Sequence, residues 1–230
     1  MVAMSAMLLG AGLVRAETGV TVQTVLIGQS VSLTGPLAAI GTDFSEGFKV
    51  YVDEVNRGGG VFGRHLKLVQ MDDGYVPQRS LSNTEKMITE DGVFAIVGNL
   101  GTGNVMAVLP LLADKRVPLF APFTGADSVR RTPNRYLFTV MASYSNEIEK
   151  MVQHLTTLGI TSIAVAYQNN PFGKEGLTGV QAAMKDRQLA PVVIAPIETD
   201  ARDAAAAAQT IARARPQAVI VAMAGKATIE

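Results

Sequence analysis

Short apolar runs without charges alternate with segments whose apolar residues recur at helical spacing along most of this chain. Such runs are typical of strands buried on both faces of a sheet, and the segments between them are typical of amphipathic helices. A repeated strand–loop–helix order favours parallel strands joined by helical crossovers. The alternation therefore predicts an α/β fold with parallel sheets flanked by helices on both faces.

The alternation divides the chain into two halves. In the first half we expect strands at 24–29, 65–73, 94–97 and 117–121, and helices at about 42–56, 77–91 and 105–112. After residue 134 the rhythm restarts, with an extended piece at 136–141 that could cross between domains. Helices at about 145–158, 174–187 and 203–214 then alternate with strands at 162–167, 192–197 and 218–222. These segments predict two α/β lobes, residues 17–139 and 140–230.

The loop after the third expected strand has the composition of a ligand-binding turn. Gly98, Gly101 and Gly103 allow tight turns and a close approach to the backbone. We expect Thr102 or Asn104 to cap the helix that follows. A helix N-terminus behind such a loop offers free N–H groups and a positive dipole end, which suit a carboxylate. The alternative is a tight turn without a ligand.

Composition excludes several other classes of function. The 230 residues carry 20 basic and 20 acidic side chains, so no basic excess indicates a nucleic-acid partner. No cysteine is present, which excludes thiolate nucleophiles, and two histidines are too few for a His-rich metal site. The motifs for dinucleotides, the P-loop, the nucleophile elbow and zinc proteases are missing. We therefore expect no enzyme, no cofactor and no metal.

The acidic pair Asp72 and Asp73 ends the second expected strand, where a ribose-binding acid could lie. We interpret the pair instead as an Asx turn into Gly74 and a cap for the helix that begins at Pro77. The remaining chemistry lies in four small polar loops at strand ends: 30–35, 99–104, 122–126 and 168–173. Such loops can hold a ligand.

The first residues predict export. Residues 2–14 are almost all apolar or small, and residues 14–16 place small side chains at the positions that a signal peptidase reads. We therefore expect a signal peptide at 1–16, too short to span a bilayer, and a periplasmic protein. The alternative is a buried N-terminal helix.

Together these segments resemble the periplasmic substrate-binding proteins of branched-chain amino-acid ABC transporters, the leucine/isoleucine/valine-binding protein family with the type I periplasmic binding fold. The resemblance runs from residue 24 to residue 225. Its motifs are at 27–36, 56–63, 72–74, 97–98, 118–126, 138–144 and 172–176. It implies two Rossmann-like lobes that close on a small amino acid or related carboxylate and a membrane permease as partner.

The resemblance also implies ligand-binding residues. Loops matching Gly101–Thr102 and Phe123–Thr124–Gly125 hold the carboxylate and ammonium of amino-acid ligands, although 123–125 departs from the usual small-small-Thr pattern. Phe172 matches an aromatic position on the opposite lobe. From its place before a helix, Tyr144 is interpreted as a further cleft residue, with a surface aromatic as the alternative; Phe123 and Phe172 could equally be core.

Family members continue beyond position 230, so the resemblance implies an incomplete second lobe, and we expect residues 17–230 alone to be prone to aggregation. Two other functions stay open at this point. The same fold could serve as a ligand-sensing module or amide-responsive regulator, or, less in keeping with the sequence, as an enzyme.

Overall fold

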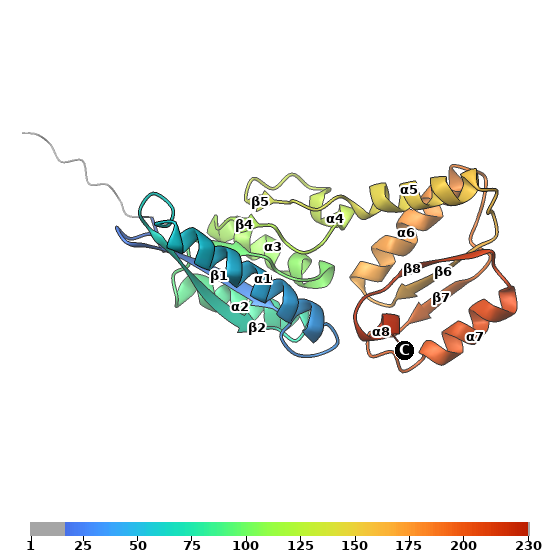
Figure 1. Ribbon diagram of the computed structural model, residues 1–230, viewed down its shortest axis with the longest axis horizontal. Coiled ribbons are helices and arrows are strands. Elements are labelled where there is room, and N and C mark those ends of the chain that lie inside the picture. Colours follow the sequence, from blue (N-terminus) through green and yellow to red (C-terminus); the bar gives the residue numbers. More distant parts are fainter. Residues whose placement is uncertain (1–16, 230) are drawn as a thin grey trace, which may run out of the picture.

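A computed structural model describes residues 17–229, which form two α/β lobes side by side (Figure 1). The first lobe is built on a five-stranded parallel sheet with the order β2-β1-β3-β4-β5. Its strands are β1 (Thr24–Val31), β2 (His65–Asp72), β3 (Ala95–Val97), β4 (Leu119–Phe120) and β5 (Leu137–Phe138). Its helices are α1 (Ala38–Arg57), α2 (Pro77–Thr89), α3 (Thr102–Lys115) and the short α4 (Asp127–Arg130).

Helices cover both faces of this sheet because its central strand is apolar on both sides. Ala95 and Val97 of β3 pack with Val52 of α1 on one face. Ile96, between them in the sequence, packs with Met87 of α2 and the apolar residues of α3 on the other face. The alternation of side chains along a strand thus gives the first lobe three layers.

The second lobe repeats the architecture on a smaller sheet with the order β7-β6-β8. Its strands are β6 (Ile163–Gln168), β7 (Ile194–Ile197) and β8 (Ala218–Ala222). Its helices are α5 (Tyr144–Thr157), α6 (Pro171–Lys185), α7 (Ala204–Ala214) and the short α8 (Lys226–Ile229). One face of the sheet packs on α5 and α6, and the other packs on small residues of α7 and α8.

The sequence predicted the fold class and every strand to within a few residues, but several helix starts and caps were wrong. Helices α3 and α6 begin at Thr102 and Pro171, three residues before the predicted starts at about 105 and 174. Helix α1 begins at Ala38 rather than near 42, because Gly41 lets its backbone lie against Ser32; a Cβ at Gly41 would be 1.9 Å from the Ser32 carbonyl oxygen. The N-cap of α3 is Gly101, not Thr102 or Asn104. The N-cap of α2 is Val76, without a side-chain cap from the acidic pair.

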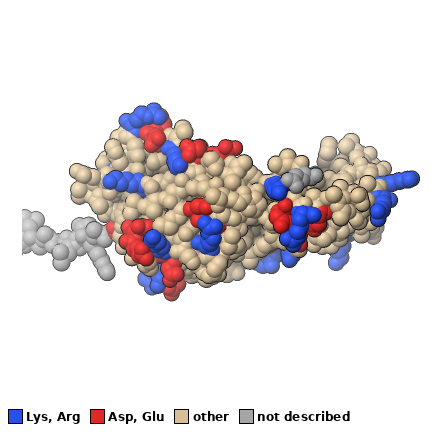
Figure 2. Space-filling model, turned by 90° about the horizontal axis from the view of Figure 1, so that it is seen from below, with Lys and Arg blue, Asp and Glu red and all other residues tan. Residues whose placement is uncertain are grey.

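The extended piece predicted at 136–141 forms β5, which pairs with β4 at the edge of the first sheet. The predicted signal peptide, residues 1–16, lies outside the described residues. In the part of the chain that the structure covers, no helix combines the length and the apolar character needed to cross a membrane. Figure 2 shows acidic and basic side chains interspersed on the visible face, in keeping with the balanced charge of the sequence.

Candidate functional site

Two helix N-termini meet between the lobes. In the first sheet the strand order reverses between β1 and β3, and α3 follows β3; in the second it reverses between β6 and β8, and α6 follows β6. Ligands of open α/β sheets bind at such reversals, outside the carboxyl ends of the strands. The two N-termini are close, since a Cβ at Gly103 would lie 3.4 Å from the Pro171 ring. This junction is the candidate site.

The N-terminus of α3 begins without a side-chain cap. Its N-cap Gly101 has a φ of +99°, a conformation that favours glycine, and it has no side chain to accept from the first N–H groups. The first residue of the helix, Thr102, is fully buried, and its hydroxyl hydrogen-bonds with the Thr124 hydroxyl at 2.8 Å. Thr124 also accepts from the Ala126 N–H at 3.2 Å. The helix therefore presents unpaired donors beside two hydroxyl groups.

Asn104 adds an unpaired donor to the same end of α3. Its side chain is 1% exposed, and its Nδ2 has no hydrogen-bond partner among the described residues. A buried amide without a partner costs free energy unless another group satisfies it. A cavity of about 320 Å³ adjoins Asn104 and is lined from both lobes, by Gly103 and Tyr75 on one side and by Asn170 and Pro171 on the other.

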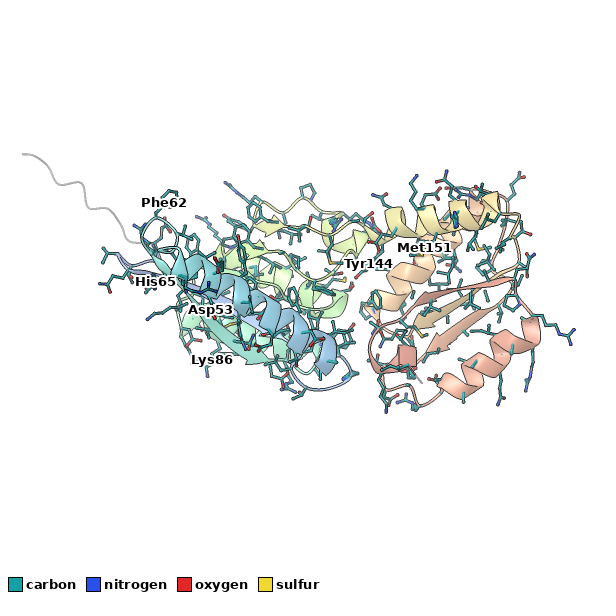
Figure 3. The ribbon with its side chains drawn as sticks, viewed as in Figure 1. Asp53, Phe62, His65, Lys86, Tyr144 and Met151 are labelled. Atoms are coloured by element: carbon teal, nitrogen blue, oxygen red, sulfur yellow. The ribbon has the colours of Figure 1, made fainter. Side chains whose placement is uncertain are left out.

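Aromatic rings stand beside the two threonines. Tyr144, the first residue of α5, lies where the chain passes from one lobe to the other (Figure 3). Its ring packs against Gly125, where a Cβ would lie 2.8 Å away, and meets Phe172 of α6 edge-on at 5.4 Å between centroids. Phe123 lies on the α1 side instead, with its ring centroid 5.0 Å from that of Phe44.

Tyr75 covers the N-terminus of α3 from the β2–α2 loop. A Cβ at Gly101 would be 2.4 Å from the Tyr75 ring, so the ring lies directly on the glycine. Tyr75 has a φ of +65°, and its N–H donates to Asp73 Oδ1 at 2.9 Å. Its hydroxyl hydrogen-bonds with the side chain of Asn170, across the junction. Burial raises the pKa of Tyr75 to about 12, the nearby Tyr144 adds to the rise, and the bond with Asn170 opposes it.

The acidic pair at the end of β2 is structural. Asp73 is fully buried and accepts from the hydroxyls of Ser30 and Ser32 at 2.9 and 2.8 Å. Asp72 accepts from the Gly74 N–H at 2.9 Å, which is the predicted Asx turn, and from the Thr34 hydroxyl at 2.6 Å. Partial burial of the Asp72 carboxyl opposes these bonds, but they hold its pKa below the ordinary value. Both carboxylates are therefore occupied by hydrogen bonds with the end of β1 and with the loops that follow β1 and β2.

The chemistry of this junction is that of holding a ligand. It presents helix N–H groups, two hydroxyls, one amide donor and aromatic walls, with no nucleophile beside a base. Across residues 17–229 no group of three or more His, Asp or Glu side chains is placed to hold a metal ion. The arrangement suits an anionic group at α3 and an apolar body against the rings.

A larger cavity of about 780 Å³ lies at the opposite end of the first lobe. It is lined by Phe94, Phe120 and Phe138 together with residues near the amino ends of the strands. Its lining comes from the first lobe alone and includes no helix N-terminus, unlike the smaller cavity. The size of a cavity is therefore a poor guide here, and we assign the site from its donors.

The structure brings most of the predicted site residues together. Thr102 contacts Thr124, Gly125 contacts Tyr144, and Tyr144 contacts Phe172. Phe123 is set apart by its packing on Phe44. Sequence reasoning missed Tyr75. It placed Asn104 and Asn170 within the loops 99–104 and 168–173 that could hold a ligand, but it named neither as a ligand-binding residue and named Asn104 singly only as a possible cap. The position of Tyr75 in the sequence could have indicated a role, because this residue also follows the carboxyl end of a strand. The loop that contains it was interpreted only as a turn.

The sequence and structure are similar to those of known proteins. A sequence model of the periplasmic binding protein family matches residues 4–230. A Leu/Ile/Val-binding protein of Rhizobium johnstonii is 32% identical over 107 residues, which cover 46% of this chain and 29% of that protein.

Solved structures agree over most of the chain. A substrate-binding periplasmic protein from Ralstonia solanacearum is 34% identical, with a TM-score of 0.82, over 86% of this chain and 56% of that one. A fatty acid ABC transporter substrate-binding protein from Thermomonospora curvata is 25% identical, with a TM-score of 0.80, over 90% of this chain and 53% of that one. The chain thus spans about half, or less, of the length of these proteins.

Proposed function

Because the chain belongs to the periplasmic binding protein family, we propose that it captures a small carboxylate, such as an amino acid, between its two lobes and delivers it to an ABC importer. The proposed ligand-binding residues are Gly101, Thr102, Phe123, Thr124, Gly125, Tyr144 and Phe172. Export to the periplasm through the apolar segment 1–16 and docking of the loaded protein on a membrane permease belong to the same proposal.

The observation that carries this proposal is the buried, uncapped start of α3 with the unpartnered amide of Asn104 beside it. A carboxylate there would accept from the first N–H groups of the helix, from the Asn104 amide and from a threonine hydroxyl. Charge-assisted bonds of this kind are about twice as strong as neutral ones. The site is therefore better matched to an anion than to a neutral group.

The relatives support the same class of ligand. One is named for leucine, isoleucine and valine, and another for fatty acids. These compounds differ in their apolar parts, and all carry a carboxylate. In the proposal, the shared group binds the α3 end of the junction, and the aromatic residues Tyr144 and Phe172 contact the part that varies.

Thermal-shift screening of the full-length protein against amino acids, aromatic acids, fatty acids and their primary amides tests the proposal. A ligand at a hundredfold excess over its dissociation constant stabilises the folded state by about 2.7 kcal/mol. We expect at least one acid to raise the melting temperature and its amide to do so less. Folded protein that responds to none of the acids would contradict the proposal.

A matched pair of variants places the ligand within the fold. Asn104→Leu removes the amide at the third position of α3 and should abolish or strongly reduce the shift given by the best acid. Asn146→Leu makes the same change at the third position of α5, on an exposed side chain that is not among the residues lining this cavity. We expect Asn146→Leu to keep the full shift; equal losses in both variants would argue against binding at α3.

A further inference from the structure

The site at α3 is shut in this structure although it contains an unsatisfied group. Thr102 is fully buried and Asn104 is 1% exposed, so neither side chain is open to a solute. Yet Asn104 Nδ2 has no partner in the described part of the chain and adjoins a cavity. A group that is both unsatisfied and covered needs a movable neighbour before a ligand can reach it.

Tyr75 covers the start of α3 at Gly101, and Pro77 and Pro171 lie against the next glycine, Gly103. The Tyr75 ring lies on Gly101, the residue that precedes the first turn, and Gly101 leaves room for the ring because it lacks a Cβ. Tyr75 also lines the cavity beside Asn104. The ring therefore covers Gly101 and forms one wall of the cavity that Gly103 and Asn104 also line.

Two features hold Tyr75 in place, and both can be released. Gly74 and Tyr75 have φ values of +58° and +65°; the second is uncommon for an aromatic residue and is maintained by the Asp73 carboxylate. On the second lobe, Asn170 bonds with the Tyr75 hydroxyl, although its side chain already accepts from the Gly173 N–H at 3.0 Å as the cap of α6. Separation of the lobes would break the bond between Asn170 and Tyr75 and keep the bond between Asn170 and Gly173, because both residues of the second pair belong to the second lobe.

We propose that Tyr75 is a gating residue, which covers the carboxylate site at the N-terminus of α3 and is latched to the second lobe through Asn170. This proposal rests on the proposed function, and it adds the residue that governs access to the site. In it, a ligand reaches Thr102 and Asn104 only when the Tyr75 ring leaves Gly101. The latch links that movement to the distance between the lobes.

The lack of cysteine in the sequence makes access to the site directly measurable. In the full chain, Asn104→Cys places a single thiol at the cavity that Tyr75 lines, and Ser82→Cys places one on the exposed face of α2 as a control. The probes are iodoacetate, a small carboxylate, and iodoacetamide, its neutral counterpart. The measured quantity is the alkylation rate of each thiol, with Tyr75 intact and replaced.

With Tyr75 intact, we expect the thiol at position 104 to react at least tenfold more slowly than the thiol at 82. Tyr75→Ala should raise the rate at 104 at least tenfold and leave the rate at 82 unchanged. Tyr75→Phe and Asn170→Ser, which release the latch and keep the ring, should give smaller increases. If Tyr75→Ala fails to fold, Tyr75→Gly removes the ring and suits the positive φ at that position.

Equal rates at position 104 with and without the ring would overturn the gating role. A preference for iodoacetate over iodoacetamide should be greater at 104 than at 82, and equal preferences would overturn the assignment of the covered site to carboxylates. These readings measure access rather than solute capture. If no acid raises the melting temperature but Tyr75→Ala raises the alkylation rate at 104, the proposed function is rejected and the gating role stands. If an acid raises the melting temperature but Tyr75→Ala leaves the rate at 104 unchanged, the gating role is rejected and the proposed function stands.

Discussion

At the scale of single residues, Thr102 and Thr124 combine two roles in one hydroxyl pair. Each hydroxyl satisfies the other in the ligand-free protein, and either can turn to donate to an anion. The sequence suggested that Thr102 either faces the ligand or caps α3. In the structure Thr102 is not the cap of α3, and its hydroxyl bonds with that of Thr124 instead.

Thr102→Val should therefore weaken both binding and stability. Loss of a hydroxyl bonded to a charged group costs about 1.5–3 kcal/mol, which corresponds to roughly tenfold to a hundredfold in affinity. Loss of the bond with Thr124 should lower the free energy of unfolding by about 1 kcal/mol. Calorimetric titration and denaturant unfolding measure the two effects. Thr178→Val, which removes an exposed hydroxyl on α6, is the control and should change neither.

Tyr75 gives the stability of the protein a dependence on alkaline pH. Burial raises the pKa of Tyr75 to about 12, above the value of 10 for an exposed tyrosine. Between these two values the folded state holds a proton on Tyr75 that the unfolded state releases. The contribution of Tyr75 to the free energy of unfolding is therefore fully present below pH 10 and is lost as the pH rises toward 12. Melting curves should show a shallower loss over this range for Tyr75→Phe. Identical slopes for the two proteins would show that Tyr75 ionises alike in both states.

At the scale of elements, the start of α3 depends on contact between two loops far apart in the sequence. Gly101 ends the β3–α3 loop, and Tyr75 lies in the β2–α2 loop. The packing of the ring on the glycine fixes one loop against the other.

Gly101→Ala should disturb this contact more than backbone strain alone explains. A non-glycine residue at such a φ costs roughly 1–3 kcal/mol, and the added Cβ would also displace the Tyr75 ring. Gly59→Ala is a matched control, because Gly59 has a φ of +96° and no atom within 4 Å of its Cβ position. We expect Gly101→Ala to lower the unfolding free energy further than Gly59→Ala, and Tyr75→Ala to reduce the excess. Equal losses at the two glycines would argue against the contact.

The elements that the sequence predicted best are those whose signal is local. Mostly apolar runs such as Ile163–Gln168 identify buried strands, and Pro77 marks the start of α2. The start of α6 at Pro171 was predicted three residues late, at about 174. The caps of α2 and α3 were wrong because the geometry of the preceding loop, rather than the nearest polar residue, decides which residue is the N-cap. Tyr75 was missed because its role depends on residues 101 and 170, which only the tertiary fold brings to it.

At the scale of the whole molecule, the lobes touch at a second place besides the junction of α3 and α6. Gly225, which follows β8, lies against the loop that precedes α1. A Cβ at Gly225 would be 2.3 Å from the Pro36 carbonyl oxygen, and the Lys226 N–H donates to that oxygen at 3.3 Å. Ala224 packs beside Leu37 and Leu100 of the first lobe.

Gly225→Ala should push the lobes apart. We expect a larger radius of gyration in small-angle X-ray scattering and a lower affinity for the best acid, since a ligand between the lobes needs both walls. Gly159→Ala controls for backbone strain, because Gly159 has a φ of +77° and no atom near its Cβ position. An unchanged radius of gyration in Gly225→Ala would show that this contact does not set the distance between the lobes.

The central claim is that the protein holds a carboxylate at the N-terminus of α3. Titration calorimetry of the full-length protein with each acid that stabilises it, and with the matching primary amide, tests this most directly. The account predicts that the acid binds at least tenfold more tightly than its amide, because only the acid is anionic. An amide that binds as tightly as its acid would contradict it.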